Sequence, residues 1–92
     1  MIGVALQCKI VTPNKLVIDQ EVDYVDIPAL EGKVGVLPDH APLVALIAEE
    51  GELQILNDGR LQKYLIKGGV AEIRNNIVSV LTNSAEEIKE TA

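Results

Sequence analysis

The sequence predicts an all-β protein, a two-sheet antiparallel β-sandwich of about ten short strands. The chain has 92 residues, which suits a single domain, and 48% of them are hydrophobic while only 2% are aromatic. Its core must therefore be built from Val, Ile and Leu, and the β-branched residues among these favour strands. Short apolar runs alternate with turn signals and no long helix separates them, a pattern typical of sandwiches or barrels rather than of βαβ folds.

Strands are expected at regular short intervals, each bounded by turn residues. In chain order the expected strands cover residues 4–10, 16–20, 21–29, 33–37, 43–49, 52–57, 61–67, 70–74 and 77–82. Of these, the run beginning at residue 43 is compatible with a strand or with one helical turn. We favour a strand that ends in a turn at Glu50 and Gly51.

Local signals refine several of these elements. The turn signal TPNK covers residues 12–15, and Asp58-Gly59 suits a type I′ hairpin turn. A second hairpin is indicated at Asn75-Asn76. Within 21–29 the alternation changes phase between Tyr24 and Val25, which indicates a β-bulge or a corner.

The last residues have a different character from the rest of the chain. Residues 84–92 are polar and helix-favouring, and Ser84 and Glu87 have the spacing of a capping box. We therefore expect a sandwich domain over 1–84, followed over 85–92 by the truncated start of a C-terminal helical region.

Composition and charge exclude several classes of partner. The net charge is −6, from 14 acidic and 8 basic residues, so the basic patch needed to bind nucleic acid is not expected. The single cysteine, Cys8, has no second cysteine with which to form an internal disulfide, and the alternating run around it predicts a buried side chain. Apolar runs are too short to span a bilayer.

Catalytic and metal-binding patterns are not found. His40 is the only histidine, and neither Ser79, inside a strand pattern, nor Ser84 lies in a nucleophile elbow. One histidine and one cysteine do not complete a structural zinc site, and the glycines do not match a phosphate-binding loop. We therefore expect no catalytic residue, no metal, no cofactor and no enzymatic activity.

Several predicted strands carry apolar residues on both faces, which leaves two interpretations open. These segments are residues 16–18, 55–57, 64–66 and 77–81. Either neighbouring strands cover the second face, or one outer sheet face docks onto a partner, because large exposed apolar patches usually mark interfaces.

Two blocks of the sequence resemble the epsilon subunit family of bacterial F-type ATP synthase, equivalent to the mitochondrial delta subunit. The blocks are EGKVGVLPDHAPLVALI at 31–47 and YLIKGGVAEIRNNIVSVLTNSAE at 64–86. The matching positions are Glu31-Gly32, Gly35, Pro38, His40-Ala41-Pro42-Leu43, Gly68-Gly69 and Val78-Ser79-Val80-Leu81.

The resemblance implies a ten-stranded sandwich that acts as a central-stalk (rotor) subunit without catalytic activity. It implies two partners, the gamma subunit and the loops of the membrane c-ring, and a peripheral location on the cytoplasmic face of the bacterial inner membrane. Glu31, Gly32 and Lys33 are expected to face the c-ring, and His40, Ala41, Pro42 and Leu43 the gamma subunit. Structural turn positions are expected at Gly35, Pro38, Asp39, Gly68 and Gly69.

The sequence departs from the family pattern at two positions and in its length. Asp39 stands where the family usually has glycine, and Lys33 stands where some relatives carry an acid. Many members continue into two helices that inhibit ATP hydrolysis and in some members bind ATP, and we expect neither inhibition by such helices nor an ATP site from these 92 residues. The alternative interpretation is a free-standing β-sandwich binding module, which would require a concave pocket with convergent polar groups.

Overall fold

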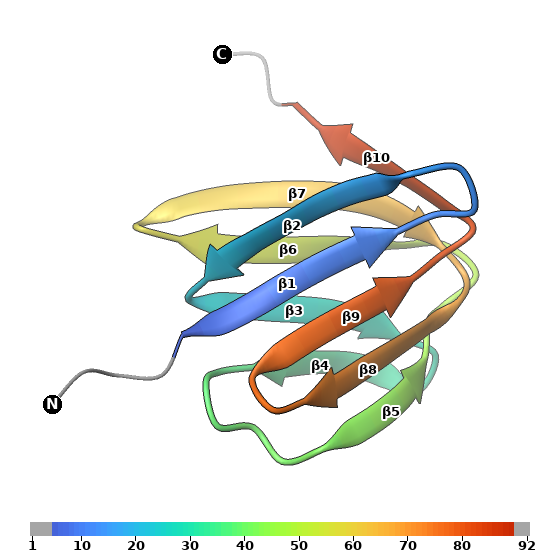
Figure 1. Ribbon diagram of the computed structural model, residues 1–92. Helices are drawn as coiled ribbons and strands as arrows, with labels where there is room; N and C mark the ends of the chain where they lie inside the picture. Colours follow the sequence, from blue (N-terminus) through green and yellow to red (C-terminus); the bar gives the residue numbers. More distant parts are fainter. Residues whose placement is uncertain (1–4, 90–92) are drawn as a thin grey trace, which may run out of the picture.

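The computed structural model describes residues 5–89 and shows two five-stranded β-sheets packed face to face (Figure 1). Within this range it contains ten strands and confirms the predicted sandwich. They are β1 (Leu6–Val11), β2 (Leu16–Val22), β3 (Tyr24–Ala29), β4 (Gly32–Val36), β5 (Leu43–Leu46), β6 (Gly51–Asn57), β7 (Arg60–Lys67), β8 (Val70–Arg74), β9 (Ile77–Leu81) and β10 (Ser84–Ile88).

The two sheets have the strand orders β2-β1-β9-β8-β5 and β10-β7-β6-β3-β4, and we call them sheet A and sheet B. The pairs formed by these strands are antiparallel, apart from β1 with β9, which are parallel. The sequence did not predict this parallel pair. Because β1 and β9 are joined by most of the chain rather than by a hairpin, no tight turn forces them to run in opposite directions.

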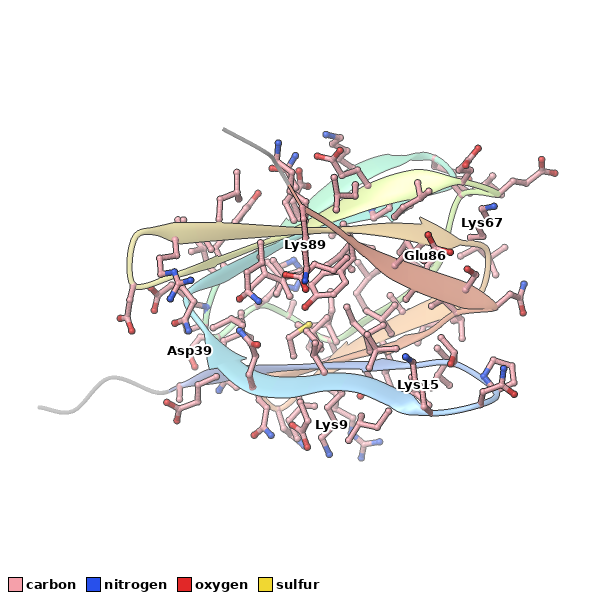
Figure 2. All side chains as sticks on the ribbon, turned by 90° about the horizontal axis from the view of Figure 1, so that it is seen from above. Lys9, Lys15, Asp39, Lys67, Glu86 and Lys89 are labelled. Atoms are coloured by element: carbon pink, nitrogen blue, oxygen red, sulfur yellow. The ribbon has the colours of Figure 1, made fainter. Side chains whose placement is uncertain are left out.

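The core lies between the sheets and is almost entirely aliphatic (Figure 2). It contains Leu6, Cys8, Ile10, Val22, Val25, Ile27, Val36, Ile47, Leu53, Ile55, Tyr64, Ile66, Ala71, Ile73, Val78 and Val80. Burial alternates along β1, where Leu6, Cys8 and Ile10 are at most 1% exposed, and this confirms the predicted position of Cys8. The Gln20 amide, from β2, also donates to Gln62 Oε1, on β7, at 2.8 Å, which joins the two sheets by a polar contact.

Both predicted hairpin turns are confirmed by their backbone angles. Asp58 and Gly59 have φ of 51° and 76°, and Asn75 and Asn76 have φ of 51° and 63°. Positive φ at both central residues is the requirement of a type I′ turn, whose twist matches that of the flanking strands.

The phase change near Tyr24 marks a corner. A bend at Asp23 separates β2 from β3, and the chain passes there from sheet A to sheet B. The Asp23 carboxylate accepts a hydrogen bond of 2.9 Å from the Asp58 N–H, so the corner is fixed to the β6–β7 turn.

The predicted helix at residue 84 is wrong where the structure describes it. Residues Ser84–Ile88 form strand β10, which pairs antiparallel with β7 at an edge of sheet B. Backbone pairing with β7 and the contact of Ala85 with the core outweigh the helical preference of a short polar segment. The sandwich therefore extends beyond residue 84, and residues 90–92 of the predicted helix lie outside the described residues. Residues 5–89 contain no helix long and apolar enough to cross a membrane.

Candidate interaction surface

The most exposed apolar region lies where the edges of the two sheets meet. In the described chain β4 pairs with β3 alone and β5 with β8 alone, so both are edge strands. A bridge between Ala29 and Ile47 and a hydrogen bond of 2.8 Å from the Leu30 N–H to the Leu46 carbonyl join the sheets here. Between the two strands runs a groove of about 420 Å³, lined by residues 29–34 and 43–46. We call β4, β5 and the loops at their ends the β4–β5 edge.

Aliphatic side chains are concentrated on this edge. Half of the ten large hydrophobic residues exposed in the described chain fall within residues 30–46, with exposed fractions from 37% to 66%. They are Leu30, Leu37, Leu43, Val44 and Leu46. Such a concentration in one segment is typical of an interface rather than of scattered surface residues.

A second apolar feature crosses the outer face of sheet A. Register pairing places one aliphatic residue from each strand in a continuous row, which comprises Leu46, Val70, Leu81, Val11 and Leu16. Leu16, Leu46 and Leu81 are more than half exposed, so neighbouring strands do not cover them. On β7 the outer residue Leu65 is partly covered, so coverage by neighbouring strands explains that strand. Docking of an outer sheet face onto a partner stays a prediction for the exposed row.

The predicted c-ring-facing residues lie at the β3–β4 turn and the start of β4. Glu31 is exposed in the turn, and Gly32 has φ of 132°, a conformation that favours glycine. Lys33 Nζ lies 3.7 Å from Asp26 Oδ2 on the neighbouring strand, and its side chain is 64% exposed. An ion pair at such exposure stabilises the fold by about 0–1 kcal/mol and does not hold the lysine away from a partner.

The predicted gamma-facing residues form the loop between β4 and β5 and the first residue of β5. His40 is half-buried and its N–H donates to the Leu37 carbonyl at 3.2 Å. Its Nδ1 lies 2.6 Å from the Ala41 carbonyl oxygen. Because a carbonyl only accepts, Nδ1 carries the proton, and in the neutral ring Nε2 is then an acceptor.

The predicted structural positions behave differently from one another. Asp39 has φ of 66°, and Gly68 and Gly69 have φ of 63° and 107°, so all three adopt the left-handed conformations expected of turn residues. Gly35 lies within β4 rather than in a turn. A Cβ there would collide with the Tyr24 hydroxyl, which explains the glycine as a site of close approach.

The structure separates the two predicted interfaces. The β3–β4 turn lies at one end of the sandwich, on the right in Figure 1, and the loop after β4 lies at the opposite end. Figure 2 shows Asp39, in that loop, at the same left-hand end. One continuous edge thus carries Glu31 at one end and His40 at the other.

Two contacts that fix turns of the sandwich to distant segments had no signal in the sequence. The Asp39 N–H donates to Asn76 Oδ1 at 2.6 Å, across 37 residues of chain. The buried hydroxyl of Thr82 lies 2.7 Å from the Gly68 carbonyl oxygen and 3.0 Å from that of Lys67, so it binds the β7–β8 turn. Both join segments that are distant in sequence, and residue spacing does not reveal such pairs.

Two observations concern the titratable groups of the described residues. Burial, and to a lesser extent the nearby Asp19 carboxylate, raises the pKa of the Cys8 thiol to about 12. Among residues 5–89, no three His, Cys, Asp or Glu side chains lie close enough together to hold a metal ion.

The fold and the edge together define a small β-sandwich whose most distinctive surface is an exposed apolar edge. Residues 5–88 match the model of the family described as "ATP synthase, Delta/Epsilon chain, beta-sandwich domain". The chain belongs to this family, and this confirms the resemblance found in the sequence.

Curated relatives carry the same family name. The chain is 42% identical over 86 residues to the ATP synthase epsilon chain of Nitratidesulfovibrio vulgaris (strain DP4), covering 94% of this chain and 63% of that protein. It is 42% identical over 89 residues to the ATP synthase epsilon chain of Herpetosiphon aurantiacus, covering 94% of this chain and 65% of that protein. The chain therefore spans less than two thirds of the length of these relatives.

Solved structures share the fold. A chain in the Euglena gracilis mitochondrial ATP synthase structure, described as OSCP/F1/c-ring, superposes with a TM-score of 0.86 at 24% identity, over 95% of this chain and 56% of that chain. A chain of the Tetrahymena thermophila mitochondrial ATP synthase central stalk and c-ring superposes with a TM-score of 0.77 at 12% identity, over 94% of this chain and 69% of that one.

Proposed function

We propose that this chain is a central-stalk subunit of an F-type ATP synthase that links the gamma subunit to the c-ring. The observation that carries the proposal is the β4–β5 edge, where exposed aliphatic residues run between two loops at opposite ends of the sandwich. Family membership supports it, because the relatives are named ATP synthase epsilon chains. A part that transmits torque between two partners needs separate contact regions on a rigid body, and this edge provides them.

In this proposal the loop after β4 docks onto gamma. Pro38 and Pro42 restrict φ on either side of His40, which lowers the ordering cost of docking. With Nδ1 bound to the Ala41 carbonyl, Nε2 of the neutral ring accepts a hydrogen bond, so the complementary group on gamma is a donor. The aliphatic side chains of Leu37 and Leu43 supply apolar contact beside it.

At the other end, the β3–β4 turn faces the polar loops of the c-ring. Glu31 and Lys33 present charges of opposite sign within three residues, so the contact is electrostatically mixed. Because Lys33 is largely exposed despite its ion pair with Asp26, it remains accessible to an acidic group of the ring.

The subunit is non-catalytic in this proposal and binds no cofactor. It lies peripherally at the cytoplasmic face of the bacterial inner membrane, held there through the ATP synthase complex. The competing proposal, a free-standing binding module, requires a concave site with convergent polar groups, and the groove at the β4–β5 edge is lined mainly by aliphatic residues.

Affinity for isolated gamma tests the proposal. The wild-type chain is expected to bind purified gamma and to co-purify with gamma and c-ring, whereas a free-standing module would be retained by neither. His40→Ala should weaken gamma binding about three- to tenfold, the factor that corresponds to one hydrogen bond. Unchanged affinity of the His40→Ala variant would refute the role of this residue, and no binding by the wild type would refute the proposal.

A further inference from the structure

Two turns that are far apart in the sequence meet at the gamma-facing end of the molecule. Asp39 belongs to the loop between β4 and β5, and Asn76 belongs to the β8–β9 turn. The Asp39 N–H donates to Asn76 Oδ1 at 2.6 Å, and Asn76 Nδ2 approaches Asp39 Oδ1 at 3.4 Å. The first is a short, well-formed hydrogen bond, and the second is at the long limit, so the two residues form one strong and one weak contact.

Asn76 is a firm anchor because its backbone is hydrogen-bonded to sheet A and directly precedes strand β9. Its carbonyl accepts a hydrogen bond of 2.8 Å from the Gln7 N–H at the start of β1, and β9 begins at the next residue. The contacts within the loop that it holds are local: the His40 N–H reaches the Leu37 carbonyl at 3.2 Å, and His40 Nδ1 lies 2.6 Å from the Ala41 carbonyl oxygen.

The backbone of Asp39 shows what the contact must maintain. Asp39 has φ of 66°, a left-handed conformation that costs a residue other than glycine free energy. In this conformation the N–H of Asp39 donates its hydrogen bond to Asn76 Oδ1. Pro38 and Pro42 fix their own φ angles but not the angles of the three residues between them.

We propose that Asp39 and Asn76 form a clasp that holds the 37–42 loop in its docking conformation. Asn76 is then a positioning residue, which acts on partner binding through Asp39 and His40. The docking half of this inference rests on the proposed function, because it takes gamma as the partner, whereas the ordering of the loop does not.

Glycine substitutions test the clasp without adding backbone strain. Asn76→Gly removes both contacts, while Asp39→Gly removes only the weak side-chain contact and keeps the strong one. We expect Asn76→Gly to accelerate exchange of the His40 amide proton, measured by NMR, about five- to tenfold, and to weaken gamma binding by a similar factor. Asp39→Gly should have a smaller effect, and adding it to Asn76→Gly should change little further.

Two control variants separate positioning from general loss of structure. Asn75→Gly alters the same turn at a residue that also has positive φ, of 51°, and should leave both measurements unchanged. Asp39→Asn keeps an acceptor oxygen and tolerates the left-handed conformation, so it should behave as the wild type. Urea unfolding of each variant checks that the sandwich itself is intact.

The exchange rate and the gamma affinity test separate parts of the proposal. If Asn76→Gly leaves His40 exchange at the wild-type rate, or if Asn75→Gly accelerates it equally, the clasp is overturned whatever the partner. If exchange accelerates but gamma affinity is unchanged, the positioning role is overturned. If the wild type does not bind gamma, the proposed function and the docking half fail together, and the exchange rates alone decide whether the clasp orders the loop.

Discussion

Truncating the aliphatic residues that flank the gamma-facing loop is expected to weaken partner binding without unfolding the protein. Leu37 is the first residue of the 37–42 loop and Val44 lies in β5 just after it, and they are 60% and 66% exposed. Both are consequently free to be covered by a partner. The double variant Leu37→Ala/Val44→Ala removes this apolar area while leaving the backbone hydrogen bonds of the loop in place.

The magnitude follows from the exposed fractions. Full burial of a Val or Leu side chain is worth about 1.5–3 kcal/mol, and roughly two thirds of that remains to be gained on docking, or about 1–2 kcal/mol for each residue. Truncation of both should therefore cost about 2–4 kcal/mol, which corresponds to a rise of about 30- to 800-fold in Kd. The free energy of unfolding should change by less than about 1 kcal/mol, because neither side chain is in the core.

Isothermal titration calorimetry with purified gamma measures the effect, and urea unfolding checks the fold. Leu56→Ala/Leu61→Ala is the matched control, since these two exposed leucines face outward from sheet B and lie opposite each other on β6 and β7. It should leave the Kd unchanged. Equal weakening by both double variants, or none by the first, would refute the assignment of the docking surface to the β4–β5 edge.

Three further predictions concern the sandwich itself. Thr82→Val should lower the free energy of unfolding in urea by about 1–3 kcal/mol, because it removes the donor that binds the β7–β8 turn, and a change below about 0.5 kcal/mol would contradict this role. Gly69→Ala should prevent folding or cost several times more than Gly59→Ala in the same assay, because a Cβ at Gly69 would collide with the backbone of Leu81 and Thr82. A Cβ at Gly59 meets no neighbouring atom, so that substitution costs only the strain of placing alanine in a left-handed conformation, about 1 kcal/mol. The Cys8 thiol should resist alkylation at pH 8 until the protein unfolds, as followed by mass spectrometry. Because the pKa of Cys8 rises from 9.0 in the unfolded chain to about 12 in the folded protein, its contribution to stability is complete below pH 9 and is lost as pH rises from 9 toward 12. The wild type should therefore lose stability relative to Cys8→Ala across that range. Equal pH dependence of the two proteins would contradict the burial argument.

Much of the fold was predictable because local signals and the fold agree. Asp58-Gly59 and Asn75-Asn76 are residue pairs that tolerate positive φ, and both form the expected turns. At position 35 a glycine is required because the Tyr24 ring lies where a Cβ would be. In each case the type of residue at the position is enough to indicate the local backbone geometry or packing.

The failures arise where distant parts of the chain decide the outcome. Residues 84–88 have helical composition but form β10, because β7 offers an edge for backbone pairing and Ala85 contacts the core. The parallel pairing of β1 with β9 likewise depends on the order of the strands in space. At the candidate site, the sequence and the family resemblance identified the loops at both ends of β4, but the Asp39–Asn76 contact required the three-dimensional structure.

Site-specific photo-cross-linking in the assembled ATP synthase tests the central claim most directly. A photoreactive residue placed at Glu31 and another placed at Ala41 would sample the two ends of the β4–β5 edge, and both positions are exposed. We expect the probe at residue 41 to cross-link to gamma and the probe at residue 31 to cross-link to a c-ring subunit. Cross-linking of both positions to the same subunit, or of neither to the rotor, would contradict the proposal that this edge joins two partners.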